Sequence, residues 1–158
     1  MKYVLPHKKI SRAVTQEDTD RMISDAIAMQ EMCSNPPKYH SKAFAVAHSQ
    51  FDDKDPLRFF VTREGEIIIN PVILSHDHRP VIRKEACTTF GISIPPTDVA
   101  RVRKLVVEYF VIEDEVMKTW IKKKHTVNGQ KAQIFQHEID HMNAKYIYDM
   151  SKYPFEIL

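Results

Sequence analysis

The chain has 158 residues, enough for one domain with a buried core, and its 23 basic and 21 acidic side chains nearly cancel. A formal net charge of +2 excludes a strong overall field toward a nucleic acid or an anionic membrane. With no apolar run long enough to span a bilayer, no signal-peptide core and only two cysteines, the composition predicts a cytoplasmic protein without a disulfide framework.

The N-terminal half is predicted to contain one helix followed by short strands. The expected elements are a helix over about 16–32, a strand over 57–62, a returning strand over 67–69 and a further short strand up to 74. Thr15 and Asp18 are spaced as in a capping box, which favours a helix start at this point. Pro36 and Pro37 exclude continuation of the helix beyond them.

The second half is predicted to be mostly strand before it ends in a helix. The expected elements are a strand over 81–86, an irregular stretch over 88–98, a hairpin of strands 102–112 and 116–121, and a helix over about 129–143. Asn128 is a suitable N-cap for that helix. A solvated strand end, rather than a phosphate-binding patch, is expected at Lys122, Lys123 and Lys124, because three lysines are too few for a nucleic-acid site. This order predicts an α+β fold with short antiparallel sheets packed around the C-terminal helix.

The predicted last helix contains the pattern His-Glu-x-x-His, formed by His137, Glu138 and His141. Four residues apart on a helix, the two imidazoles lie on one face and can bind a single Zn²⁺ or Fe²⁺ ion. Glu138 would then reach water at the metal. The pattern predicts a catalytic metal site, and the alternative is an exposed polar helix face whose histidines bind nothing.

Two histidines leave such a site one protein ligand short. The longer protease motif requires glycine and histidine where this chain has Ala144 and Ile147, and beyond them Asp149 and Glu156 are the remaining carboxylates. Cys87 is the strongest candidate, because a thiolate with two imidazoles leaves a fourth position for water. An inert buried thiol at Cys87 is one alternative, and a metalloprotease that uses Asp149 or Glu156 is another.

Three motifs, in order along the chain, resemble those of peptide deformylases. Ala43 to Gln50 is similar to Gly-x-Gly-x-Ala-Ala-x-Gln, Glu85 to Thr89 to Glu-Gly-Cys-Leu-Ser, and Gln136 to Ala144 to Gln-His-Glu-x-Asp-His-Leu-x-Gly. The resemblance covers essentially all of residues 1–150. The family's glycines are replaced by Ala43, Ala45, Ala86 and Ala144. These changes, and an end without the long C-terminal helix of many bacterial members, imply a compact, divergent member of bacterial or phage origin, with an organelle origin left open.

The resemblance implies a deformylase fold and a hydrolase that removes the N-formyl group from the N-terminal formylmethionine of newly made polypeptides. It implies that residues 1–158 form a single catalytic domain with one divalent metal ion held by Cys87, His137 and His141. Fe²⁺ is the expected native ion, with Zn²⁺, Ni²⁺ or Co²⁺ in purified protein. The expected partners of this cytoplasmic monomer are nascent chains, and hence the ribosome, without a membrane or a nucleic-acid site. Because alanines replace four of the family's glycines, the alternative is a deformylase-like binding module without activity.

The resemblance also implies roles around the metal. Glu138 would take a proton from water and later deliver it to the departing amine. The Gln50 side-chain amide and the Thr88 backbone N–H would donate hydrogen bonds to the oxyanion. Glu85 and Arg101 would form an ion pair behind the cysteine.

The substrate's methionine side chain is expected to enter an apolar pocket, with the peptide paired along residues 43–47. The residues expected to bind substrate are Phe44, Ala45, Val46 and Ile134, together with the His137 ring. Gln130 and Gln133 stand where the family is often apolar, which predicts a wetter pocket and looser selectivity. Asp140 is expected to orient a ligand histidine or cap a neighbouring backbone group, and a plain surface carboxylate is the alternative.

Overall fold

A computed structural model describes residues 3–4, 7–36, 42–90 and 95–150, with the backbone alone at residues 149 and 150. In these ranges the helices are α1 (Thr19–Ser34), α2 (Gly129–Met142) and α3 (Ile147–Met150), and the 3₁₀ turns are η1 (Gln16–Asp18), η2 (His48–Gln50) and η3 (Thr88–Phe90). The strands are β1 (Ala45–Ala47), β2 (Phe59–Thr62), β3 (Ile67–His76), β4 (Pro80–Glu85), β5 (Thr97–Val102), β6 (Lys104–Asp114) and β7 (Thr119–Asn128).

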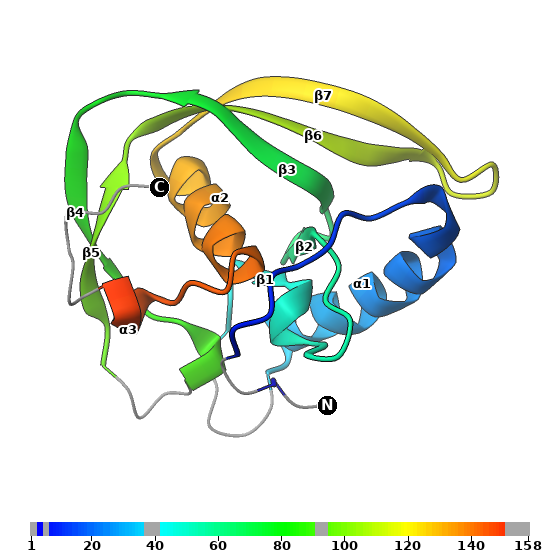
Figure 1. The fold of residues 1–158 in the computed structure, drawn as a ribbon, viewed down its shortest axis with the longest axis horizontal. Helices are drawn as coiled ribbons and strands as arrows, with labels where there is room; N and C mark the ends of the chain where they lie inside the picture. Colours follow the sequence, from blue (N-terminus) through cyan, green and yellow to red (C-terminus); the bar gives the residue numbers. More distant parts are fainter. Residues whose placement is uncertain (1–2, 5–6, 37–41, 91–94, 151–158) are drawn as a thin grey trace.

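Two antiparallel sheets surround α2, as Figure 1 shows. Within the described residues, one sheet has five strands in the order β1-β2-β3-β6-β7, and the other is the β4–β5 pair. Helix α2 contacts β1, β6 and β7 of the first sheet and β5 of the second. This arrangement confirms the α+β fold expected from the order of the elements.

Helix α2 divides its buried residues between an apolar face and a polar face. The apolar residues recur at helical spacing and pack against the five-stranded sheet in one core cluster; they are Ala132, Phe135, Ile139 and Met142. Phe135 meets Phe60 of β2 edge to face, with ring centroids 5.2 Å apart, and burial of such a side chain contributes about 1.5–3 kcal/mol. The polar face, with His137, Glu138 and His141, is thereby turned toward the chain that follows β4.

Helix α1 closes a second core on the other side of β1 and β2. Its Met22, Met29 and Met32 are 0–1% exposed and pack with residues of β1, β2 and β3. The capping box predicted at Thr15 is present, because the Asp18 carboxylate accepts the Thr15 backbone N–H at 2.9 Å. The first turn is the 3₁₀ turn η1, so the helix begins close to the predicted position.

Strand β3 runs without a break from Ile67 to His76. The prediction of two separate strands, one over 67–69 and one up to 74, was therefore wrong at Asn70. Asn70 has φ +50, and the pairing with β6 shifts register between Ile69 and Val72. Such a bulge bends a strand without ending it. The Asn70 side chain is held by the backbone of Val14, which it meets at 2.8 and 2.9 Å.

Strand β7 is longer than predicted and continues to Asn128, so Lys122, Lys123 and Lys124 lie in mid-strand. Because β7 is at the edge of its sheet, these lysines discourage pairing with another chain. Asn128 occupies the predicted N-cap position of α2, but its side chain makes no capping hydrogen bond. The one-turn helix α3 was not predicted.

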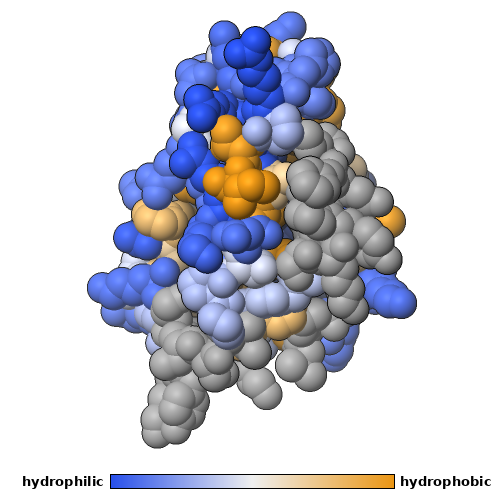
Figure 2. Space-filling view, turned by 90° about the vertical axis from the view of Figure 1, so that its left-hand side faces the viewer, coloured by the Kyte–Doolittle hydropathy of each residue, from blue (hydrophilic) through white to orange (hydrophobic). Residues whose placement is uncertain are grey.

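The surface on the side of β4 and β5 is mostly hydrophilic, and Figure 2 shows hydrophobic residues there only in small patches among the coloured atoms. Ile82 of β4 is one exposed apolar residue, at 54%. None of the helices in the described part of the chain combines the length and apolarity needed to cross a lipid bilayer.

Candidate metal centre

Three side chains from distant parts of the chain converge in the way a metal ion requires. The Cys87 sulfur lies 3.2 Å from Nε2 of His141, which lies 3.1 Å from Nε2 of His137. The three ligand atoms are all within 4.8 Å of one another. A tetrahedral ion with metal–nitrogen bonds of about 2.0–2.1 Å separates its nitrogens by about 3.3 Å. The donors therefore fit a divalent transition-metal ion, with soft sulfur and borderline nitrogen ligands.

Local structure explains why these atoms meet. His137 and His141 are one turn apart on α2, and Cys87 follows the end of β4 before η3. Gln136 fastens α2 to β5, because its amide donates to the Val102 carbonyl and accepts the Val102 N–H, both at 3.0 Å. The side chain thus pairs with β5 as another strand would. Sequence analysis did not assign this role to Gln136, although an amide directly before His137 was visible in the motif.

A buried cluster of charges supports the histidine side of the site. Arg101, 1% exposed, donates two hydrogen bonds to Glu85 at 2.8 and 2.9 Å and one to Asp140 at 2.6 Å. Glu85 also accepts from Nδ1 of His137 at 2.9 Å. Since a carboxylate only accepts, the proton of His137 lies on Nδ1, which leaves Nε2 free to bind a metal.

The cluster contains the predicted Glu85–Arg101 ion pair and corrects both expectations for Asp140. Asp140 is 2% exposed, so it is not a surface carboxylate, and its partner is Arg101 rather than a histidine or a backbone group. The carboxylate that contacts a candidate ligand histidine is Glu85, which meets Nδ1 of His137. The sequence could not make this distinction, because both carboxylates lie within the motifs.

The electrostatics of the cluster follow from burial and partner. Burial alone would raise the pKa of Glu85, but Arg101 and His137 outweigh it and lower that pKa to about 2. Burial likewise opposes ionisation of Cys87, yet His141 and His137 bring the thiol pKa well below its ordinary value. A thiolate is the form that binds metal. Burial raises the pKa of Glu138 and of Asp140.

Glu138 and Gln50 lie beside the three donors. Glu138 is 4% exposed, and its Oε2 has no hydrogen-bond partner among the described residues. Gln50 of η2 accepts the Ala47 N–H at 2.8 Å and donates to the Thr89 hydroxyl at 2.8 Å. Its Nε2 is 3.7 Å from the Cys87 sulfur. Thr89, which sequence analysis did not single out, is therefore part of the site.

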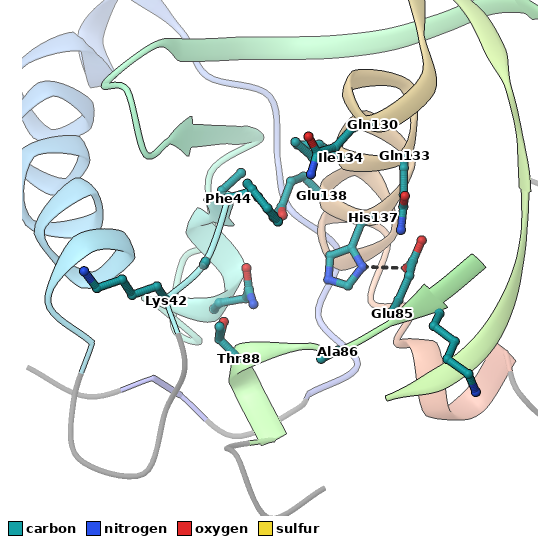
Figure 3. A pocket seen from close by; sticks show the side chains of 14 residues that line it. Lys42, Phe44, Glu85, Ala86, Thr88, Gln130, Gln133, Ile134, His137 and Glu138 are labelled. Carbon is teal, nitrogen blue, oxygen red and sulfur yellow. Dashed lines mark hydrogen bonds and ion pairs between the residues drawn. The ribbon is translucent and has the colours of Figure 1, made fainter. Parts of the chain in front are cut away.

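A groove of about 220 Å³ opens over the site. Figure 3 places His137 and Glu138 of α2 on one side of it and Phe44 and Thr88 on the other. The predicted substrate residues Phe44, Ala45 and Ile134 line the groove, as do Gln50, Glu85, Gln130 and Gln133. Phe44 is 52% exposed and is covered on one face by the Arg63 guanidinium, 4.8 Å from the ring centre.

Val46, which was expected to bind substrate, is not among the residues that line the groove. It is 0% exposed and packs into the core beneath α1, because successive residues of β1 point to opposite sides. The alanines that replace family glycines differ in backbone conformation: among the four, Ala144 alone has a positive φ, of +57.

A model of the polypeptide deformylase family matches residues 8–154. The chain belongs to the peptide deformylase family. The peptide deformylase of Thermotoga petrophila is 30% identical over 114 residues, which are 70% of this chain and 63% of that protein. This chain therefore spans less than two thirds of the length of that relative.

Solved deformylase structures have the same fold. The crystal structure of peptide deformylase from Thermotoga maritima matches with a TM-score of 0.73 at 23% identity, over 94% of this chain and 97% of that one. The deformylase structure from Legionella pneumophila matches with a TM-score of 0.71 at 26% identity, over 95% and 85% of the two chains. The family is metal-dependent, in keeping with the group of Cys87, His137 and His141.

Proposed function

We propose that this protein is a peptide deformylase that hydrolyses the formyl amide of N-formylmethionyl peptides with one divalent metal ion. The observation that carries the proposal is the convergence of the Cys87 sulfur with the ring nitrogens of His137 and His141, beside the buried carboxylate of Glu138. We expect Fe²⁺ as the native ion, with Zn²⁺, Ni²⁺ or Co²⁺ in purified protein, because a thiolate with two imidazoles suits all of these.

The proposed mechanism divides the work between the ion and the chain. A bound divalent ion would lower the pKa of water from about 16 toward about 7 and polarise the formyl carbonyl. Glu138 accepts the proton of the attacking water and delivers it to the amine nitrogen as that nitrogen leaves. The Gln50 side-chain amide and the Thr88 backbone N–H donate to the oxyanion. Glu85 holds the His137 ring throughout, through the hydrogen bond to Nδ1.

The peptide is proposed to bind along β1, which is an edge strand paired with β2 in the part of the chain that the structure describes. Backbone pairing at residues 43–47 would make binding tolerant of sequence beyond methionine. Phe44 and Ile134 supply apolar surface for the methionine side chain, and Gln130 and Gln133 add polar lining. We further propose a single catalytic domain and a cytoplasmic monomer, acting on nascent chains at the ribosome.

Hydrolysis of formyl-Met-Ala-Ser by protein reconstituted with Fe²⁺ under anaerobic conditions tests the function. Turnover is expected, with Glu138→Gln retaining the metal but losing about 10²–10⁴-fold in kcat. No turnover by the metal-loaded protein would favour the binding module without activity.

Metal analysis of Cys87→Ala separates a deformylase from a metalloprotease of another class. A deformylase loses its metal with the sulfur, whereas a protease with Asp149 or Glu156 as ligand keeps it. The side chain of Asp149 and all of Glu156 lie outside the described residues.

A further inference from the structure

The Gln50 carboxamide is held at both of its ends. Its oxygen accepts the backbone N–H of Ala47 at 2.8 Å, and its nitrogen donates to the Thr89 hydroxyl at 2.8 Å. Gln50 is 3% exposed and Thr89 is 7% exposed, so water does not compete freely for either contact. The Ala47 contact also fixes which end of the amide is oxygen, because an N–H donor excludes the flipped orientation.

The two hydrogens of a primary amide lie in one plane, about 120° apart, so fixing one direction fixes the other. One Gln50 hydrogen is used by Thr89. The same nitrogen also donates to the Cys87 sulfur at 3.7 Å, a long contact to a weak acceptor. The second hydrogen therefore points to the Cys87 side of the metal centre, where a stronger oxygen acceptor can replace the weak contact to sulfur.

We infer that Thr89 is a positioning residue, whose hydroxyl accepts one Gln50 N–H and so directs the other at the oxygen of the bound formyl group. The inference rests on the proposed deformylase function and adds a residue to it. Thr89 comes from η3, immediately after the cysteine-bearing segment, and Gln50 comes from η2 at the end of β1. The contact therefore ties η2 to η3 beside the groove, on the side opposite His137 and Glu138.

Removal of the acceptor has a definite consequence for Gln50. Valine has the shape of threonine without the oxygen, so Thr89→Val leaves a buried amide hydrogen unpaired, and the carboxamide is expected to rotate toward another acceptor. A misdirected donor loses part of the stabilisation whose complete removal costs about 10²–10³ in kcat. We expect Thr89→Val to lower kcat about tenfold with KM within twofold, and Thr89→Ser, which keeps the oxygen, to stay within about twofold of wild type.

The measurement compares four proteins loaded with the same metal, with formyl-Met-Ala-Ser as substrate. They are wild type, Thr89→Val, Thr89→Ser and Thr126→Val, which makes the same chemical change at an exposed position of β7. Equal metal content and equal melting temperature are required of all four. A Thr89→Val protein as active as wild type overturns the inference, and so does a Thr89→Ser protein as impaired as Thr89→Val.

A double-mutant cycle separates positioning from a general effect on structure. If Thr89 acts through Gln50, then Thr89→Val added to Gln50→Ala changes kcat by no more than about twofold, because the group that it orients is gone. A full tenfold loss in the Gln50→Ala background means that Thr89 acts independently of Gln50, which overturns the inference.

A second readout does not require turnover. The side-chain amide protons of Gln50, identified in ¹⁵N spectra by their loss in Gln50→Ala, should exchange with solvent at least about tenfold faster in Thr89→Val than in wild type or Thr89→Ser. Unchanged exchange overturns the positioning role even if kcat falls. If metal-loaded wild type shows no turnover, the proposed function fails, and this exchange measurement still decides whether Thr89 holds Gln50.

Discussion

Two arginines in this protein each bridge two carboxylates, one in the interior and one at the surface. Arg101 binds Glu85 and Asp140 with 1% of its side chain exposed, behind the proposed metal centre. Arg12 binds Asp18 and Asp55 with 44% exposed, where the N-terminal segment meets η1 and the chain before β2. The ion pairs have nearly equal lengths, 2.8 and 2.6 Å for Arg101 against 2.8 and 2.8 Å for Arg12.

The difference in water access gives the two clusters different consequences. In an exposed ion pair both charges are hydrated whether or not they are paired. Its net contribution to the free energy of unfolding is therefore about 0–1 kcal/mol. In a buried cluster each member depends on the others, because a charge left alone in the interior has neither partner nor water. Glu85 extends that dependence to His137 through its hydrogen bond to Nδ1. The buried cluster therefore fixes a proposed metal ligand, whereas the exposed cluster joins surface segments.

The largest expected effect comes from Arg101→Leu. It leaves Glu85 and Asp140 buried without their cation, and a loss of about 3–5 kcal/mol in the free energy of unfolding is expected. Urea unfolding of metal-loaded protein measures it, with Arg103→Leu, at an exposed neighbouring position, as the control expected to stay within about 0.5 kcal/mol. A loss under about 1 kcal/mol for Arg101→Leu would mean that the buried cluster and the exposed cluster contribute equally little to the free energy of unfolding.

His48 sharpens the comparison, because it is a buried histidine linked to the exposed cluster. It faces Asp25, which pairs with Arg21 at 3.5 Å, and Arg21 pairs with Asp55 at 2.6 Å. His48 is 0% exposed; its Nε2 faces Asp25 at 3.1 Å, and its Nδ1 accepts the Leu57 N–H at 2.8 Å. The other charged groups near it are Arg21 and Asp52. Burial lowers the pKa of His48 below 6.5, against the opposing pull of Asp25. A second ring proton would point at the Leu57 N–H, so the native fold favours the neutral ring.

The lowered pKa of His48 determines how the stability of the protein changes with pH. Because the folded protein binds this proton less readily than the unfolded chain, the stabilisation from His48 is complete above about pH 6.5 and is lost as the pH falls below it. The loss can reach about 1.4 kcal/mol per pH unit. His48→Asn keeps a hydrogen-bond acceptor without titrating, so unfolding measured between pH 7 and pH 5 should show a shallower slope for the variant. Parallel slopes for the two proteins would contradict the prediction.

The features of this site that could be predicted from the sequence are those set by residues close together along the chain. The helical spacing of His137 and His141 and the N-cap candidate Asn128 were enough to predict the helix and the face that carries both imidazoles. Cys87 was the strongest candidate for the third ligand on the chemistry of its thiolate, and the three-motif resemblance then implied it, because nothing local relates that residue to α2. The pairing of Asp140 with Arg101 and the contact of Thr89 with Gln50 were not predicted. Both join segments 39 residues apart, and their side-chain partners depend on a packing that hydrophobic spacing does not specify.

Helices α1 and α2 also differ in the backbone conformation of the residues that follow them. Helix α1 is followed by Asn35 with φ −123, whereas α2 is followed by Asn143 and then by Ala144 with φ +57. A left-handed alanine costs about 1–2 kcal/mol, so Ala144→Gly is expected to raise the free energy of unfolding by about 1 kcal/mol. Ala28→Gly, within α1, is the matched control and should lower it by about 0.5–1 kcal/mol. A destabilised Ala144→Gly protein, measured in the same urea unfolding, would mean that the methyl makes contacts worth more than the strain.

The smallest effect is expected for Arg12→Gln, which removes the charge and leaves a shorter polar side chain. Arg12 meets both oxygens of Asp18 and both of Asp55 at 2.8–2.9 Å, so the loss should lie near the upper end of the range for exposed pairs, about 1 kcal/mol. Salt separates this cluster from the buried one. The screening length falls from about 10 Å at 0.1 M salt to about 3 Å at 1 M, so the effect of Arg12→Gln should shrink by at least half over that range, while the effect of Arg101→Leu persists. An Arg12→Gln loss above about 2 kcal/mol, or one that salt leaves unchanged, would show that water access does not distinguish the two arginines.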